Sequence, residues 1–207
     1  LSLHDALPIL ISNLINRSSV CLDIGANIGT HTVWMSKQCK NGLVVSFEPQ
    51  LYIFELLTTN CMLNECLNVI PHNCALSNEY DKIKVLVNTP ESAGSKNYGE
   101  FRIDKYQSSQ GINLNCYKLD DIDIPQISNL DFIKIDVEEH EKSVILSGEK
   151  IITQHKPSMY IEFNSHNGNE DLIKLLNEFG YKCYWHIYPK FNPNNFRKQP
   201  VNIWISE

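Results

Sequence analysis

Residues 22–30 read Leu-Asp-Ile-Gly-Ala-Asn-Ile-Gly-Thr and constrain the possible folds more than any other part of the chain. An apolar run ends at Asp23, two glycines four residues apart follow, and a helical pattern then begins. The next apolar run, residues 43–47, ends at Glu48. A strand, a tight turn, a helix and a second strand with a carboxylate at its tip form a unit that binds a nucleoside-like cofactor at the carboxyl ends of its strands.

The residues of the turn discriminate between kinds of cofactor. Of the dinucleotide pattern G-x-G-x-x-G only Gly25 and Gly29 are present, because Asn27 occupies the middle position, and no lysine follows as in a P-loop. Asp23 would repel a phosphate and attract a cation, which suits the amino group and sulfonium of S-adenosylmethionine. Glu48 is placed to accept hydrogen bonds from ribose hydroxyls. The structural alternative is that the two glycines only cap the strand and relieve helix packing.

Composition limits the class of protein. The 207 residues, 43% of them hydrophobic, suffice for one core and most simply form one domain. A net charge of −6 argues against a nucleic-acid partner, and no apolar run approaches the roughly 18 residues of a membrane span. Seven cysteines without a C-x-x-C pair predict buried free thiols in a reducing compartment, the cytoplasm.

Residues 1–9 look like the translation of a common sequencing-adapter oligonucleotide, so we expect them to be an artefact and no part of the fold. The expected domain is therefore a single one over residues 10–207.

Strand and helix patterns alternate along the remaining chain. Strands are expected at 68–76, 130–137 and 156–163, helices at 51–64, 138–152 and 172–179, and a closing hairpin at 181–188 and 201–206. Residues 81–87 and 112–116 alternate as an antiparallel insertion, and the polar segment 88–110 between them is a candidate lid or substrate surface. The pattern predicts an α/β fold with a mostly parallel sheet and helices on both faces.

Six short motifs follow one another in a set order, at residues 23–29, 46–49, 73–77, 119–121, 131–138 and 161–162. In this order they resemble the FkbM-type methyltransferases, a branch of the class I S-adenosylmethionine-dependent fold, over residues 20–206. The resemblance implies a Rossmann-like, seven-stranded sheet with its last strand antiparallel. It also implies methyl transfer to a hydroxyl of a sugar, glycan or secondary metabolite. The family usually has glycine where this chain has Glu139.

The resemblance further implies a set of cofactor contacts at the ends of three strands. These are Asp23, Gly25, Ala26, Asn27 and Gly29 in the methionine-side loop, Glu48 at the ribose, and Asn73, Cys74 and Ala75 at the adenine.

Three residues are candidates for the catalytic step. Asp136 stands at the end of the fourth strand, where it could take the proton of an acceptor hydroxyl or, alternatively, cap the next helix. Lys134 points to the same face by strand alternation and needs a carboxylate, which Asp136 or Glu162 could provide. That ion pair could tune the acceptor or be purely structural. His166 is an alternative base.

Other functions remain open from the sequence. Asp136, Glu138 and Glu162 could bind a hard cation, but the spacing does not require one, so no metal is expected. A nicotinamide-dependent oxidoreductase on a related fold and a degenerate S-adenosylmethionine-binding module are the alternative functions; Glu139 keeps the second open. The expected partner is a small-molecule or glycan hydroxyl acceptor.

Overall fold

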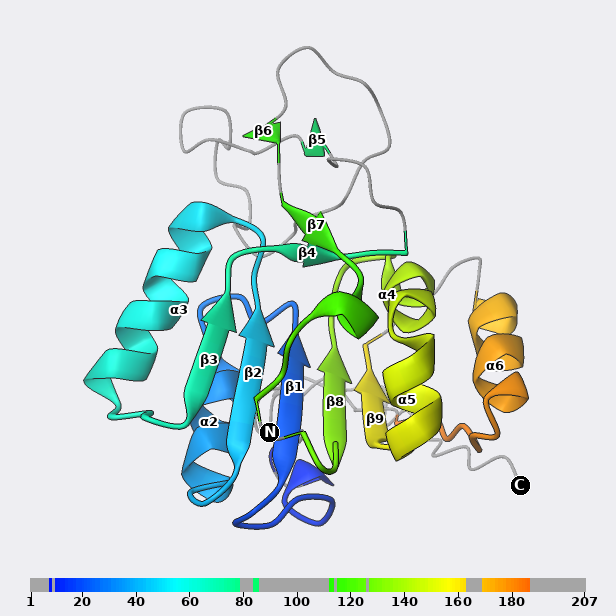
Figure 1. Cartoon of the computed structure of the whole chain (residues 1–207), viewed down its shortest axis with the longest axis horizontal. Helices are drawn as coiled ribbons and strands as arrows, with labels where there is room; N and C mark the ends of the chain where they lie inside the picture. Colours follow the sequence, from blue (N-terminus) through cyan, green and yellow to red (C-terminus); the bar gives the residue numbers. More distant parts are fainter. Residues whose placement is uncertain are drawn as a thin grey trace, which may run out of the picture. The chain divides into compact units, whose positions relative to one another are not determined.

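The computed structural model describes residues 8, 10–78, 84–85, 112–113, 115–125, 127–162 and 169–186 (Figure 1). Residues 15–164 form one compact unit, and residues 1–14 with 165–207 form another. The predicted site residues, His166 excepted, belong to the first unit, which is therefore described in more detail.

A parallel sheet of five strands forms the centre of the first unit (Figure 1). Its spatial order is β3-β2-β1-β8-β9. The strands are β1 (Val20–Ile24), β2 (Leu43–Phe47), β3 (Val69–His72), β8 (Phe132–Ile135) and β9 (Ser158–Ile161). The chain runs outward from β1 to β3 and then returns to the other side of β1, so the order of strands reverses there. Such a reversal opens a crevice at the carboxyl ends of the strands, where α/β proteins bind ligands.

The expected α/β class is confirmed, but the expected number of strands is wrong. The sheet of the described residues has five strands rather than seven. Residues 181–186 form no strand, although their apolar residues alternate. Residues 201–206, the expected last strand, lie outside the described residues.

Helices cover both faces of the sheet. The helices α2 (Thr30–Gln38) and α3 (Leu51–Leu63) follow β1 and β2, and α4 (Glu141–Ser147) and α5 (Glu149–His155) follow β8. Figure 1 shows α2 behind the sheet and α4 and α5 in front of it. Because both faces are covered, β2 and β8 read as nearly unbroken apolar runs in which almost every residue is buried.

The helix expected from residue 138 begins later than predicted. Glu138 and Glu139 have φ values of 50° and 72°, so neither belongs to a right-handed helix, and α4 starts only at Glu141. The expected helix is also interrupted at Gly148, where α4 ends and α5 begins. Glu138 and Glu139 therefore lie in the loop after β8, and Glu141 is the acidic residue in the first turn of α4.

Short strands follow the third strand of the central sheet. The expected strand 68–76 is split into β3 and β4 (Ala75–Leu76), and β4 pairs in parallel with β7 (Cys116–Tyr117). The predicted antiparallel insertion is confirmed by β5 (Lys84–Val85), which pairs with β6 (Ile112–Asn113). The polar segment 88–110 lies outside the described residues. The short 3-10 helix η1 (Leu119–Asp121) precedes β8.

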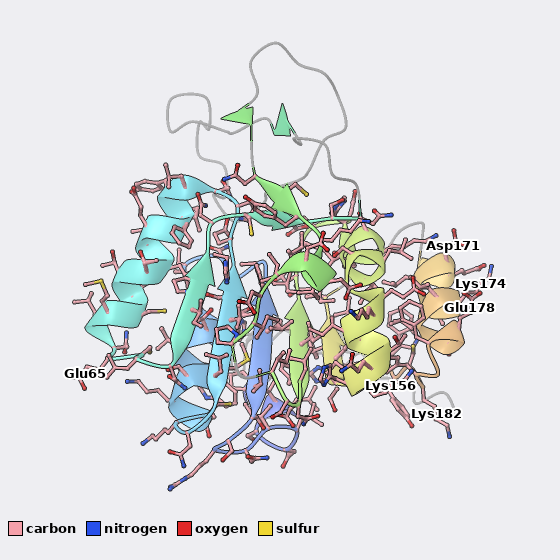
Figure 2. All side chains as sticks on the ribbon, viewed as in Figure 1. Glu65, Lys156, Asp171, Lys174, Glu178 and Lys182 are labelled. Atoms are coloured by element: carbon pink, nitrogen blue, oxygen red, sulfur yellow. The ribbon has the colours of Figure 1, made fainter. Side chains whose placement is uncertain are left out.

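The second unit contains α6 (Asn169–Glu178), the amphipathic helix expected at 172–179. Its apolar residues Leu172 and Leu176 are buried, and Figure 2 shows Asp171, Lys174 and Glu178 projecting from the same helix. Gly180 ends it, with a φ of 81° and a hydrogen bond from the next amide back to the Leu176 carbonyl. None of the helices in the described ranges combines the length and apolar character that a membrane span requires.

Candidate functional site

The turn after β1 requires its first glycine for two reasons. Gly25 has a φ of +76°, and a Cβ there would lie 1.8 Å from the carbonyl oxygen of Asp136. Its amide donates a 3.0 Å hydrogen bond to the carbonyl of Phe47. The turn is thus held against the ends of both neighbouring strands, β2 and β8. Close packing of the protein itself, rather than space for a phosphate, explains this glycine.

The second glycine of the turn is required by helix packing. Gly29 has a φ of +89°, and a Cβ there would lie 2.5 Å from Cδ1 of Leu57 in α3. Ala26 and Leu57 belong to the same buried apolar cluster. Both glycines are therefore explained by packing within the protein, as in the structural alternative. The same contacts fix the path of the loop that contains the predicted cofactor residues.

Glu48 forms a rigid carboxylate at the end of β2. Its side chain is 4% exposed; Oε2 accepts a 3.0 Å hydrogen bond from the Asn27 amide and Oε1 a 2.9 Å bond from the Gln50 amide. Burial raises the pKa of Glu48 to about 7, against the opposing effect of the two amide bonds. The predicted ribose residue and the predicted loop residue Asn27 are thus in direct contact.

The residues predicted at the adenine follow β3. Asn73 donates hydrogen bonds from Nδ2 to the carbonyls of Glu48, at 2.9 Å, and Pro49, at 3.1 Å. Cys74 and Ala75 are both buried, and burial raises the pKa of the Cys74 thiol to about 12. The structure therefore brings Asn73 beside Glu48, whereas it packs Cys74 and Ala75 into the protein.

Asp23 is directed into the protein. Its side chain is 0% exposed, Oδ2 accepts a 2.6 Å hydrogen bond from the Thr32 hydroxyl, and Oδ1 lies 3.6 Å from Nζ of Lys134. The register of β1 and β8 pairs Asp23 with Lys134, so both side chains lie on the same face of the sheet. The cation that Asp23 contacts in this structure is a lysine of the protein.

Lys134 also contacts Asp136. The side chain is 2% exposed, and its Nζ lies 3.2 Å from Oδ2 of Asp136. Burial acts to lower the pKa of Lys134, but the charges of Asp23 and Asp136 outweigh it and raise that pKa. The ion pair expected between Lys134 and Asp136 is therefore confirmed, and Asp23 is a second partner.

Glu162 completes this group at the end of β9. Its amide donates to the carbonyl of Ile135, and the Asp136 amide donates to that of Ile24, both at 2.9 Å, so each residue extends its strand pairing by one step. Burial and the charge of Asp136 raise the pKa of Glu162 to about 7, against the opposing effect of the Lys134 charge. The Asp136 side chain is 33% exposed.

The acidic loop after Asp136 carries further carboxylates. The buried Glu141 accepts a 3.1 Å hydrogen bond at Oε1 from the Glu139 amide, and burial raises the pKa of Glu141. Among the described residues, no three His, Cys, Asp or Glu side chains are grouped to hold a metal ion. His166 lies outside the described residues.

Two polar neighbours of the site did not emerge from the sequence. Thr32 bonds Asp23 across nine residues, and only the packing of α2 on β1 brings them together. Tyr160 is the register partner of Lys134 in β9, and burial together with Glu162 raises the pKa of Tyr160. The sequence signal for Tyr160 was strand alternation, because a residue two positions before Glu162 lies on the same face of the strand.

Comparison with known proteins identifies the family. The Methyltransferase FkbM domain matches residues 23–183. "Methyltransferase 1" of Beauveria bassiana (strain ARSEF 2860) is 24% identical over 143 residues, which cover 61% of this chain and 57% of that protein. The matched region thus spans little more than half of that relative's length.

In fold, the chain is similar to the crystal structure of precorrin-6y C5,15-methyltransferase from Geobacter metallireducens GS-15. The TM-score is 0.51 at 14% identity, over 85% of this chain and 69% of that chain. Because the family domain covers most of the sequence, this chain belongs to the FkbM methyltransferase family.

Proposed function

We propose that this chain is an S-adenosylmethionine-dependent O-methyltransferase that methylates a hydroxyl of a sugar, glycan or secondary metabolite. The observation that carries the proposal is the Glu48 carboxylate, held by the amides of Asn27 and Gln50 where β1 and β2 end. Membership of the FkbM family supports the reaction class over a nicotinamide-dependent oxidoreductase.

The carboxylate of Glu48 fits a ribose. Each of its oxygens accepts one backbone hydrogen bond, which leaves a lone pair on each oxygen for a ribose hydroxyl. Two backbone contacts also hold the side chain in place before the ligand arrives, so little ordering is needed on binding. Burial disfavours the ionised form that accepts these bonds, so ligand binding and ionisation of Glu48 should favour each other.

The remaining cofactor residues are assigned by their place around Glu48. In the proposal the methionine side is formed by Gly25, Ala26, Asn27 and Gly29, and the adenine side by Asn73, Cys74 and Ala75. Asp23 is assigned to hold the preceding strand and the loop in place, since its carboxylate contacts Lys134 and Thr32. When bound, S-adenosylmethionine supplies an already activated methyl group, so positioning the acceptor accounts for much of the rate.

Asp136 and Glu162 are the proposed proton acceptors. A sugar hydroxyl would lose its proton as its oxygen takes the methyl group, while the bond from that group to the sulfonium breaks and a neutral thioether leaves. A nearby base with a pKa near neutrality would assist this step by accepting the proton. The position of both residues directly after neighbouring strands and the pKa of about 7 of Glu162 support this role. Nζ of Lys134 lies 3.2 Å from Oδ2 of Asp136 and attracts its negative charge.

The charge of the site supports a neutral acceptor. Asp136, Glu138, Glu139 and Glu162 lie in or beside the loop after β8, and the whole chain carries a net charge of −6. A phosphate backbone would be repelled by such a surface. A hydroxyl of an uncharged sugar or metabolite does not meet that repulsion.

Calorimetric titration of the full chain with S-adenosylmethionine and with its demethylated product tests the cofactor. Saturable binding is expected, and Glu48→Ala should weaken it about tenfold or more because the ribose hydroxyls lose their acceptor. Glu55→Gln, an exposed glutamate on α3, is the matched control and should bind as the wild type does. Unchanged affinity in Glu48→Ala would refute the ribose assignment.

Labelled methyl transfer to carbohydrate acceptors tests the reaction itself. Binding of S-adenosylmethionine without transfer to any hydroxyl acceptor would favour the degenerate binding module. A fluorescence titration with NADH distinguishes the oxidoreductase hypothesis from the methyltransferase. An oxidoreductase would bind NADH saturably, and a methyltransferase would not.

A further inference from the structure

A series of polar contacts runs from α2 across the sheet to the end of β8. Thr32 donates a 2.6 Å hydrogen bond to Asp23, whose other oxygen lies 3.6 Å from the Lys134 ammonium. The same ammonium lies 3.2 Å from Asp136, and the charges of Lys134 and Asp136 both act on Glu162 at the end of β9. Side chains from α2, β1 and the ends of β8 and β9 are therefore coupled through one buried lysine.

We propose that Thr32 is a positioning residue for the two carboxyl groups at the ends of β8 and β9. It acts through Asp23 and Lys134 and touches neither of those carboxyl groups itself. The inference rests on the proposed function, in which these groups receive the acceptor proton.

The first step of the argument concerns Asp23. Its carboxylate is 0% exposed, so water cannot solvate the charge. Within the described part of the chain, the Thr32 hydroxyl is the hydrogen-bond donor to this carboxylate, and Oδ1 accepts no hydrogen bond. Without the hydroxyl, Asp23 would depend entirely on the attraction of Lys134.

The second step concerns the ammonium, which is shared between two carboxylates. Its distances of 3.6 Å to Asp23 and 3.2 Å to Asp136 are similar, and Coulomb energy varies inversely with distance. A small displacement therefore redistributes the interaction. Loss of the Thr32 hydroxyl should draw Lys134 toward Asp23 and away from Asp136.

The third step concerns Glu162, which reports the position of the ammonium. Asp136, Glu138 and Tyr160 are the acidic or ionisable groups beside it, and Lys134 is the cation. The ammonium lowers the pKa of Glu162 against the larger effects of burial and Asp136, which raise it. Withdrawal of Lys134 should therefore raise that pKa, and a closer Lys134 should lower it.

The test is a carbon-13 NMR titration of the Glu162 carboxyl group in the ligand-free full chain, with its signal assigned by Glu162→Gln. Thr32→Val keeps the shape of the side chain but removes the hydroxyl, and it should move the titration midpoint upward by about half a pH unit. Thr32→Ser keeps the hydroxyl and should titrate as the wild type does.

Ser36→Ala is the matched control. Ser36 lies one turn further along α2, is buried, and donates a 2.6 Å hydrogen bond to the neutral Oδ1 of Asn68. Its removal should loosen the helix comparably without moving the Glu162 midpoint. A folded Thr32→Val variant with the wild-type midpoint, or an equal shift in Ser36→Ala, would overturn the proposal.

Asp23→Asn tests the same series of contacts and should shift the Glu162 titration midpoint in the opposite direction. It removes the competing charge, so Lys134 should move toward Asp136 and the Glu162 midpoint should fall. An unchanged or raised midpoint overturns the proposal even where Thr32→Val does not fold. Because the readout needs no cofactor, a failure of methyl transfer would refute the proposed function and leave this result interpretable.

Discussion

Lys134 and Asp23 form an ion pair between neighbouring strands, with Nζ 3.6 Å from Oδ1 and exposures of only 2% and 0%. A pair so deeply buried costs desolvation energy, which is recovered only when further contacts satisfy both groups. Thr32 supplies such a contact to Asp23, and Asp136 supplies one to Lys134. The pair explains both why the apolar strand β1 contains an acid and why the apolar strand β8 contains a lysine.

Replacing the buried lysine should be costly. Lys134→Met leaves Asp23 buried without its cation and is expected to reduce the free energy of unfolding by about 3–5 kcal/mol. Urea unfolding of the two proteins measures this. Lys174→Met is the control, because Lys174 pairs with Glu170 and Asp171 on the exposed side of α6 and should change stability by less than about 1 kcal/mol. Equal effects of the two variants would contradict the burial argument.

Glu48 should make stability depend on pH. Its pKa is raised from 4.5 to about 7 in the folded protein, so the folded state holds the proton more tightly than the unfolded state. The stabilisation is full below about pH 4.5 and is lost as the pH rises through about 7. Relative to Glu48→Gln, the wild type should lose on the order of 1–3 kcal/mol between about pH 5 and pH 8 in urea unfolding.

The binding of cofactor should show the opposite trend with pH. Ribose hydroxyls donate to the ionised carboxylate, so affinity for S-adenosylmethionine should increase as the pH rises through about 7. Calorimetry on both sides of that pH measures it. Affinity that stays constant, or that rises equally in Glu48→Gln, would separate Glu48 from the ribose.

Glu139 occupies a conformation that suits glycine. Its φ of 72° costs a non-glycine residue roughly 1 kcal/mol. Glu139→Gly should therefore stabilise the fold by up to about 1 kcal/mol, as measured by thermal or urea unfolding. Glu55→Gly, at an exposed position within α3, should destabilise it by about 1 kcal/mol, since glycine is unfavourable inside a helix. Destabilisation by both variants would show that the left-handed conformation carries no strain.

Asp120 provides the missing cap of α5. The helix is preceded by Gly148, which has no side chain, and Asp120 from η1 accepts hydrogen bonds from the amides of Lys150, at 3.0 Å, and Ile151, at 2.9 Å. Asp120→Ala should cost about 1–2 kcal/mol in urea unfolding. The neighbouring, exposed Asp121 offers a control, and Asp121→Ala should change stability by less than about 0.5 kcal/mol.

Local sequence patterns predicted much of the fold. The apolar run before Asp23, the turn with Gly25 and Gly29, and the apolar periodicities of α3 and α6 each appear where expected, because strand, turn and helix preferences act over a few residues. Element ends were less well predicted where a tertiary contact decides them, as at the left-handed Glu138 and Glu139.

The residue types at the site could also be predicted from the sequence, but the contacts between them could not. Strand direction and side-chain alternation can be inferred from the sequence, and they place several carboxylates at the carboxyl ends of the parallel strands. The contacts of Asp23 with Lys134 and Thr32, and of Glu48 with the Asn27 amide, depend on how the elements pack together. The register between strands and the packing of α2 on the sheet set those distances, and both arise from contacts between segments far apart in the chain.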